Sequence, residues 1–436
     1  MIKKLFALII IFYSSFAFAE TIKTDVLVIG NGPAAVAAAI QSSRSKLKTV
    51  LLVNGRWMPM LQGKSMITID DNHDIPSGIW GEFRKQVHQF YKSKPGYDTT
   101  YTSPLQFEPF AGAGILKKIA DTTARLTLKL DAPYQAVERD GTGWKVTYTQ
   151  NGEVYYVKTK TLIDATDGNK LVKLAGASLP PALTYNDHLY RTSIAAGDDL
   201  AVPVNVAGKS TDPAASYFIP MSLLVVKDAD NLFVTENVLP NQPNLPMQMA
   251  IGQGVGTMAA FCAFFKTTSK NLKVRAIQGE LLDFKGYLLP FDDVNPRDHY
   301  FRAIQQIAAT GLLKGVVSKG DHGQAKYLFL PDSAVYTAGI KPVLTEIYSR
   351  AFIWFNSKQP GTKFTTGNLL SFISEITLTD PKTFQNTMRK EWKSKYKFKS
   401  DFDLKHVVTR REFAILANQY LNPFARTVDL TGRIMN

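Results

Sequence analysis

The hydrophobic pattern between residues 24 and 53 predicts two strands of a parallel sheet with a helix between them. Residues 24–29 (TDVLVI) form a short, β-rich and almost wholly apolar run, as expected of a strand buried on both faces. Small residues follow at 30–35 (GNGPAA), and an alanine-rich helical run continues to residue 43. A second apolar run at 49–53 (TVLLV) completes the unit. Strands joined in this way lie side by side and parallel.

Later segments predict more strands. Residues 134–141, 144–148 and 155–157 indicate an antiparallel meander with an Asp-Gly turn. Residues 161–168 (TLIDATDG) are an apolar strand that opens into small residues, and residues 231–237 (NLFVTEN) are another apolar strand. A helix beginning with spaced glycines is expected from residue 250 (AIGQGVGTMAA).

The pattern changes near Leu272 to a series of amphipathic helices. Residues 274–282 and 300–310 follow helical spacing, and Gly311 suits a helix C-cap. Thr409 followed by Glu412 is a capping box that opens the last helix. The fold class is therefore α/β: a Rossmann-like domain with a three-layer parallel sheet and an antiparallel meander, an inserted region, and a helical C-terminal domain.

The expected domain boundaries follow from these changes in the hydrophobic pattern. They are a leader at 1–19, a nucleotide-binding domain at 20–270 with an inserted substrate region at about 178–230, and a helical region at 271–436. At 436 residues the chain is too long for one core.

The first 19 residues have the organisation of a secretory signal peptide. Lys3 and Lys4 precede an apolar run from residue 5 to 18, and Ala17-Phe18-Ala19 forms a small-residue cleavage site. The alternative, a membrane anchor, needs about 20 apolar residues. The sequence therefore predicts export, with no transmembrane segment in the mature chain. The single cysteine, Cys262, excludes an intramolecular disulfide and favours the periplasm or cell surface of a bacterium.

The chain carries a formal net charge of +14, or +12 once the two lysines of the leader are removed. A surface with this charge could bind nucleic acid, an anionic polysaccharide or a membrane face. No nucleic-acid motif accompanies it, so that partner is not expected. The densest positive stretch, residues 389–399, is most simply a solvated helix face.

The strongest candidate for a ligand-binding site is the first glycine-rich turn, at residues 30–35. Gly30 permits the tight turn, Gly32 lets the backbone approach a pyrophosphate, and Ala35 allows close packing of helix on strand. Free N–H groups at the start of the helix then face the phosphates. An acidic residue normally follows the second strand to bind the ribose, but Asn54 stands there, before Gly55. This departure leaves open a degenerate fold without cofactor.

The strand ends and the later glycine helix complete the candidate site. Small residues at the end of the 161–168 strand would pass close to a dinucleotide without blocking it, and the glycines after residue 250 would approach a flat ring. The candidate cofactor-binding residues are Gly30, Gly32, Pro33, Ala34, Ala35, Asn54, Gly55, Ala136, Ala165, Thr166, Gly252, Gln253 and Gly254.

Together these motifs resemble the FAD-dependent oxidoreductases described as xanthan-lyase-like, a family of exported bacterial proteins. The resemblance covers roughly residues 23 to 270 and rests on segments 30–39, 77–83, 107–109, 163–166, 174–176, 217–220, 231–234 and 252–253. It implies FAD as the cofactor and a redox reaction at the flavin. In this chain the segment that should lie over the flavin is compressed to residues 238–246, which predicts FAD binding with altered or reduced turnover.

Two C-terminal segments also resemble S-layer-homology units, through Phe291-Asp292-Asp293-Val294 and the capping-box helix. This resemblance implies attachment to envelope polysaccharide. The simpler interpretation is a helical appendage packed on the flavin domain.

No conventional catalytic constellation is present. The six histidines lack metal-ligand spacing, and there is no G-x-S-x-G motif, so neither a metal site nor serine hydrolysis is supported. Tyr190 and Arg191 could contact substrate or be ordinary structural residues. The leading hypothesis is an exported FAD-dependent oxidoreductase that takes hydride from an unidentified organic small molecule. The family resemblance adds a carbohydrate-related substrate as a candidate. The rival is a non-catalytic envelope-binding protein on a degenerate flavin fold.

Overall fold

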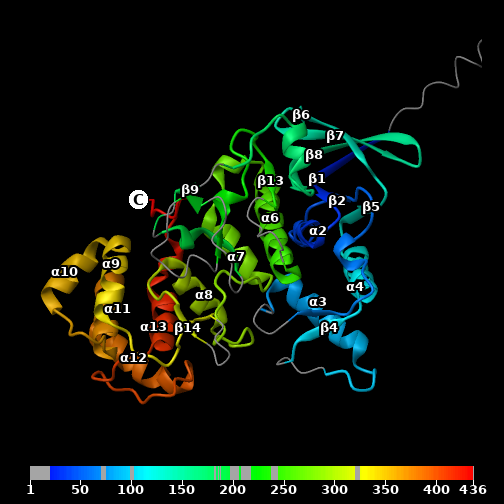
Figure 1. Ribbon diagram of the computed structural model, residues 1–436. Coiled ribbons are helices and arrows are strands. Elements are labelled where there is room, and N and C mark those ends of the chain that lie inside the picture. Colours follow the sequence, from blue (N-terminus) through cyan, green and yellow to red (C-terminus); the bar gives the residue numbers. More distant parts are fainter. Residues whose placement is uncertain are drawn as a thin grey trace, which may run out of the picture.

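The computed structural model describes residues 20–69, 75–98, 103–180, 183–184, 186, 188–196, 206–207, 218–236, 244–319 and 325–435. The sheet lies at one end of the molecule and a cluster of short helices at the other, with α6 and α7 between them (Figure 1). The predicted leader (residues 1–19) and residues 238–243 of the compressed segment lie outside the described residues.

A seven-stranded mixed sheet forms the nucleotide-binding half. Its order is β5-β2-β1-β8-β7-β6, with β13 also paired to β8. The strands are β1 (Thr21–Gly30), β2 (Thr49–Leu52), β5 (Leu126–Lys129), β6 (Tyr134–Asp140), β7 (Gly143–Gln150), β8 (Glu153–Ala165) and β13 (Leu232–Val234). Strands β5, β2, β1, β8 and β13 run parallel, whereas β6 and β7 form the antiparallel meander.

The apolar run of β1 is buried because both faces of the sheet are covered. Residues 26–29 are fully inaccessible to solvent. Val26 and Val28 point into the larger core with the helices, whereas Leu27 and Ile29 point into a second core with the meander. Alternate side chains of one strand therefore join two layers, as expected of a doubly covered sheet.

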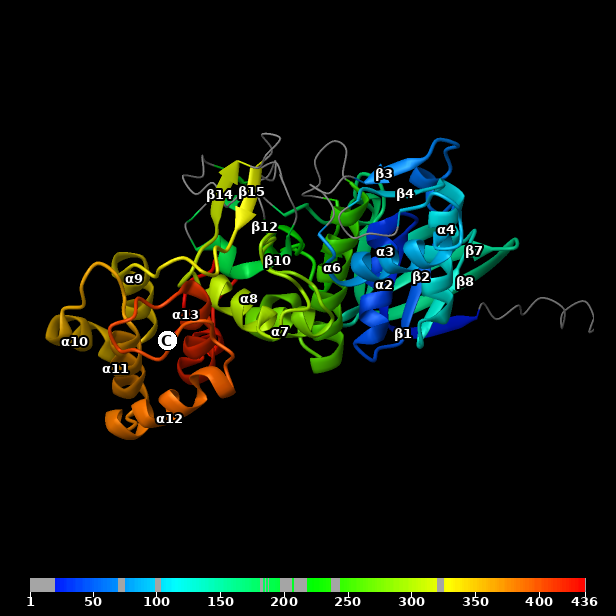
Figure 2. The ribbon, with the colours of Figure 1, turned by 90° about the horizontal axis from the view of Figure 1, so that it is seen from below.

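Helices α2 (Pro33–Arg44) and α6 (Leu245–Phe265) are packed together on one face of this sheet. The other helices of this half are α3 (Gly78–Tyr91), α4 (Pro109–Thr122) and α5 (Lys170–Leu174), with the short helix η1 (Pro59–Leu61) and the small sheet of β3 (Ile67–Ile69) and β4 (Leu105–Phe107). Figure 2 shows α2, α3 and α6 next to one another.

Short elements connect this half to the C-terminal helices. They are β9 (Leu183–Thr184), η2 (Leu189–Thr192), β10 (Ser193–Ala196), β11 (Val206–Ala207), β12 (Phe218–Pro220), η4 (Met221–Leu223), η5 (Ser269–Asn271), α7 (Val274–Asp283), α8 (Phe301–Thr310), β14 (Val316–Lys319) and β15 (Ala325–Leu328).

The C-terminal helices are arranged around three short crossing segments. Val335, Phe364 and Val408 form a closed ring: the Val335 amide donates to Val408 O (3.1 Å), Val408 to Phe364 O (2.9 Å) and Phe364 to Val335 O (2.9 Å). All three side chains are buried. The helices of this part are α9 (Thr337–Ile347), α10 (Ser349–Lys358), α11 (Thr366–Thr377), α12 (Pro381–Ser394) and α13 (Arg410–Leu416), followed by η6 (Ala417–Leu421) and η7 (Pro423–Ala425).

Two residues further along each segment, a second ring of backbone hydrogen bonds runs in the opposite direction. Thr337 N donates to Thr362 O, Thr366 N to His406 O, and Arg410 N to Ser333 O, at 2.8–3.0 Å. Each donor opens a helix: α9, α11 or α13. The described residues therefore contain three units, each a short crossing segment followed by a helix, in a pseudo-threefold arrangement, although the middle unit is hard to recognise from its residues.

The predicted fold class is confirmed, including the meander, the helices at 274–282 and 300–310 and the capping box of Thr409 and Glu412. The start of α6 was predicted wrongly. This helix begins at Leu245, because the Asn244 side chain accepts a hydrogen bond from Met247 N, and its glycines lie in the interior. By length and composition α6 could cross a membrane, but 78% of its most apolar window is buried inside the protein.

Candidate dinucleotide site

The glycine turn ends β1 and opens α2 without any side-chain cap. Gly32 occupies the N-cap position in an extended conformation, and no side chain bonds to the first turn. The amides of Ala34 and Ala35 therefore have no partner within the helix or from a cap. An uncapped helix N-terminus behind a glycine turn is suited to bind phosphate oxygens.

The two glycines have different roles. A Cβ on Gly30 would lie 2.2 Å from Ala165 O, so Gly30 is needed for β1 to lie against β8. A Cβ on Gly32 would meet only Gln248 Oε1, at 3.8 Å. Gly32 thus has open space beside it, which is the condition for a diphosphate to approach the backbone.

The segment after β2 is held against this turn at two points. The Asn31 side chain donates to Asn54 O (3.3 Å), and Met58 N donates to Asn31 O (3.0 Å). Between these points Gly55 adopts a left-handed conformation (φ 85°) with no atom near the position of a Cβ. Asn54 and Gly55 therefore lie beside the glycine turn of residues 30–35, the phosphate turn, and the Asn54 side chain is exposed to solvent. Their contact with a cofactor remains a prediction.

The end of β8 lies on the other side of β1 from the segment after β2. Gly30 and Ala165 are register partners. The next residue, Thr166, is fixed by Asp164, whose Oδ1 accepts from the Thr166 amide (3.0 Å) and hydroxyl (2.6 Å). Asp164 is fully buried, and burial raises the pKa of its carboxyl while these hydrogen bonds oppose the rise. Thr166 is thus positioned by the loop itself.

Residues 25–180 match the FAD dependent oxidoreductase family. This match lies within the nucleotide-binding half and indicates FAD as its dinucleotide. Thioredoxin reductase 2 of Arabidopsis thaliana is 38% identical over 79 residues, which are 16% of this chain and 21% of that protein. The chain thus spans about a fifth of the length of that relative.

Two solved structures have partial similarity to this chain. The anhydrotetracycline hydroxylase OxyS of Streptomyces rimosus is 14% identical with a TM-score of 0.35, over 61% of this chain and 65% of that one. The p-nitrophenol 4-monooxygenase PnpA of Pseudomonas putida DLL-E4 is 13% identical with a TM-score of 0.27, over 36% and 44%.

In the FAD domain, the first turn of α6 is the part of that helix nearest the phosphate turn. Gln248 lies beside Gly32, and its amide nitrogen is 3.7 Å from Met60 Sδ. Sequence analysis missed both residues, because the predicted helix start was at the later glycines. A polar side chain in the first turn of a long helix could have indicated Gln248.

The interior glycines of α6 pack against protein. A Cβ on Gly252 would lie 2.1 Å from Ala34 O, and one on Gly254 would lie 2.7 Å from Ile194 Cγ1. Gln253 is buried, donating to Gln41 Oε1 (3.0 Å) and accepting from Ile79 N (3.2 Å). The expected contact of Gly252, Gln253 and Gly254 with cofactor therefore remains a prediction, and the contacts found are those of α6 with α2, α3 and β10.

Ala136 lies in β6, separated from β1 by β8 and β7. Its neighbour Tyr134 is close to the β8 turn. Burial raises the pKa of the Tyr134 phenol, Asp164 adds to the rise, and hydrogen bonding with Thr166 opposes it. The structure thus brings Tyr134 to the end of β8, whereas cofactor contact by Ala136 remains untested.

Glu236 is a titratable group at the same edge that sequence analysis overlooked. It follows β13, whose Val234 is the register partner of Asp164, and its carboxylate accepts from Gly168 N (2.8 Å). Burial raises the pKa of Glu236 to about 7, and the nearby Asp167 and Asp164 add to the rise, although the Gly168 hydrogen bond lowers it. A carboxyl that exchanges its proton near neutral pH is suited to proton transfer.

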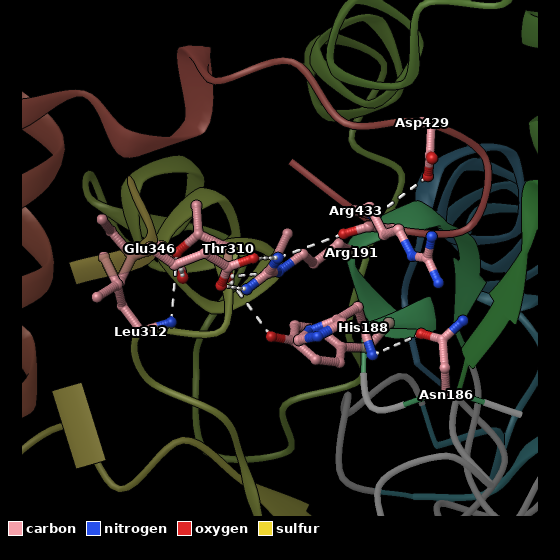
Figure 3. Close-up of polar contacts among 12 residues, drawn as sticks. Asn186, His188, Arg191, Thr310, Leu312, Glu346, Asp429 and Arg433 are labelled. Carbon is pink, nitrogen blue, oxygen red and sulfur yellow. Dashed lines mark hydrogen bonds and ion pairs between the residues drawn. The ribbon is translucent and has the colours of Figure 1, made fainter. Parts of the chain in front are cut away.

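Arg191, one of the two candidate substrate contacts, lies at a junction with the C-terminal helices (Figure 3). The other, Tyr190, is buried, and its hydroxyl donates to Thr310 O (3.5 Å). Arg191 is buried and forms a bidentate ion pair with Glu346 of α9 (2.8 and 2.6 Å). It also donates to Thr310 O at the end of α8 (3.1 Å) and to Gly432 O near the C-terminus (3.3 Å). Arg191 is therefore a structural residue.

Cys262 is a core residue. It is buried in α6, and burial raises the pKa of its thiol to about 12, so the thiolate is not formed at neutral pH.

Proposed function

We propose that this protein is an exported FAD-dependent oxidoreductase acting on an organic small molecule. One observation carries the proposal: the uncapped start of α2 faces open space at Gly32, between the segment held by Asn31 and the end of β8. When bound there, FAD would supply hydride-transfer chemistry.

The residues of this chain would bind and orient the cofactor. The amides of Ala34 and Ala35 would donate to the diphosphate, and the helix dipole would favour its negative charge. Asn54 would offer the ribose a neutral hydrogen-bond partner in place of a carboxylate. Glu236 would hold or accept a proton at the edge of the site near neutral pH.

The decisive experiment is an absorbance spectrum of the purified mature protein after incubation with FAD and removal of free flavin. The proposal expects flavin bands near about 375 and 450 nm. A colourless protein that takes up no added FAD would show that the fold has lost its cofactor.

The proposal of export rests on a separate observation. The charged n-region, apolar run and small-residue site of residues 1–19 support a signal peptide. Fractionation of the producing cell, with N-terminal sequencing of the mature protein, tests this. A mature N-terminus at Glu20 is expected. A full-length protein retained in the cytoplasm would contradict export.

A second candidate function is envelope attachment through the C-terminal helices, as in the S-layer-homology resemblance. The pseudo-threefold ring of residues 335, 364 and 408 favours it, since it provides three repeated units. A hollow of about 410 Å³ between α9 and α10 offers an aromatic ring, two amides and a lysine: it is lined by Thr337, Lys341, Phe355, Asn356, Gln359 and Pro360. These are side chains of the kind that bind an acidic sugar.

Co-sedimentation of the whole protein with an insoluble anionic polysaccharide tests this candidate. Envelope attachment is supported if Lys341→Glu weakens this binding and Lys382→Glu leaves it unchanged. Lys382 is the matched control because it lies on the separate helix α12. Equal binding by both variants would reduce the interaction to net charge.

A further inference from the structure

The last turn of α6 leaves the core and exposes two phenylalanines. Residues 258–263 of this helix are buried, whereas Phe264 and Phe265 are 59% and 61% exposed. Their rings are in contact with each other (centroids 5.0 Å apart), and Phe265 also packs on Phe261 (4.7 Å). Placing two adjacent aromatic rings in water is unfavourable, so this pair indicates a surface that another phase or molecule covers.

The pair borders a hollow of about 440 Å³ whose other residues come from α6 itself and from the ends of α2 and α7. It is lined by Arg44, Ser45, Lys46, Ala260, Phe261, Phe264, Phe265, Glu280, Asp283 and Phe284. A neighbouring hollow of about 340 Å³ shares Arg44 and Lys46 and extends to Arg125, just after α4. The aromatic pair therefore lies at one edge of a basic face.

Three cations of this face are free, whereas Arg44 and the carboxylates are paired. Lys46, Lys266 and Arg125 are exposed and have no ion-pair partner among the described residues. Glu82 pairs with Arg44 (2.6 Å) and Asp283 with Arg302 (2.5 Å), while Glu280 hydrogen-bonds Ser45. The local charge available to a partner is positive.

This face is at the opposite end of the FAD domain from the phosphate turn. Helices α2 and α6 run in the same direction, since Gly252 packs on Ala34 and Gly256 on Ala38. The twelve residues from Gly252 to Phe264 span about 18 Å along the helix. A partner bound at Phe264 would leave the dinucleotide site open.

We propose that this face, formed by Phe264, Phe265, Lys46, Lys266 and Arg125, binds the surface of an anionic phospholipid membrane. The two rings enter the headgroup region, and the cations contact lipid phosphates, which is the usual combination in peripheral membrane attachment. The free positive charge argues for an anionic partner, and the exposed ring pair argues for one with an apolar interior. A lipid surface supplies both.

Vesicle sedimentation of the full-length mature protein, loaded with FAD if it binds it, tests the proposal. Vesicles of phosphatidylcholine alone are compared with vesicles containing about one third phosphatidylglycerol, at low and at physiological salt. Binding is expected only to the anionic vesicles, and it is expected to fall with salt because exposed charges are screened over about 8–10 Å.

Two variant pairs separate the contributions. Phe264→Ser with Phe265→Ser is expected to lower the partition constant at least about ten-fold, the effect of keeping one exposed ring out of water. Lys46→Gln with Lys266→Gln is expected to lower it about 25-fold, at about five-fold for each cation. Phe110→Ser is the matched control, because Phe110 is 71% exposed but lies in the first turn of α4, at the other end of that helix from Arg125. It is expected to bind like the wild type.

Three results would overturn the proposal. The wild type could fail to sediment with anionic vesicles, or the Phe264/Phe265 variant could sediment as well as the wild type. Analytical ultracentrifugation could instead show a dimer that the same variant abolishes, in which case a second copy of the chain covers the rings. Unchanged circular dichroism of each variant establishes that the fold is intact.

Discussion

Replacing Gly252 with alanine tests the contact between α2 and α6 on which the geometry of the phosphate turn depends. The new Cβ would lie 2.1 Å from Ala34 O and 2.8 Å from Ala34 Cα. Both are backbone atoms, so no side chain can rotate away, and the helices must separate by about 1 Å to restore ordinary contact. Overpacking of this kind costs about 1–3 kcal/mol.

Helix propensity opposes this cost. Alanine is favoured over glycine inside a helix by about 0.5–1 kcal/mol, so Gly252→Ala should lower the free energy of unfolding by about 1–2 kcal/mol. Gly114 in α4 is the matched control: it is exposed, helical and has no atom within 4 Å of its Cβ position. Gly114→Ala should raise the free energy of unfolding by about 0.5–1 kcal/mol.

Urea unfolding followed by circular dichroism measures both variants against the wild type. Gly252→Ala should also weaken FAD binding, because Ala34 carries one of the amides that would hold the diphosphate. If Gly252→Ala were as stable as Gly114→Ala and bound FAD equally well, the close packing of α6 on α2 would not position the turn.

Three further changes test separate parts of the structure. The raised pKa of Glu236 means that its proton is held more tightly in the folded protein than in the unfolded chain; the resulting stability is fully present below about pH 4.5 and is lost as the pH rises through about 7. The thermal midpoint should therefore fall less steeply between pH 5 and pH 8 in Glu236→Gln than in the wild type, and parallel curves would refute this role. Asn54→Asp restores a carboxylate beside the phosphate turn and should tighten FAD binding by about 1 kcal/mol, about five-fold in Kd by fluorescence titration; unchanged affinity would place the ribose elsewhere. Arg191→Met leaves the Glu346 carboxylate without its partner and should lower the free energy of unfolding by about 3 kcal/mol, whereas Arg350→Met, at an exposed pair with Glu375, should change it by less than about 1 kcal/mol.

The elements with strong local signals were predictable from sequence. Residues 24–29 could only be a buried strand, and the glycine turn followed by an alanine-rich helix indicated where a phosphate would bind. Thr409 and Glu412 marked the start of α13 because the capping box is a local interaction.

Other features depend on contacts between distant residues. The glycines of α6 suggested a helix start, but their function in packing requires the position of α2, about 218 residues earlier. The role of Arg191 depends on Glu346 and Gly432, which no local pattern indicates. The raised pKa of Glu236 arises from burial and from the loop after β8, so its sequence neighbours gave no sign of it.

The threefold arrangement of the C-terminal helices illustrates the same limit. Its three crossing segments centre on valine, phenylalanine and valine, which differ in size and have dissimilar neighbours. What they share is a backbone hydrogen-bonding pattern, and that pattern is visible only when the three segments are brought together.

The most direct test of the account is the affinity for FAD of the wild type and of Gly32→Val, measured by flavin fluorescence on folded protein. A side chain at Gly32 meets only Gln248 Oε1 at 3.8 Å, so the fold should tolerate it, but it would occupy the space through which a diphosphate reaches the α2 amides. The account predicts that the wild type binds FAD and that Gly32→Val loses at least about 100-fold in affinity, roughly two charge-assisted hydrogen bonds. Equal binding by the two proteins would contradict it.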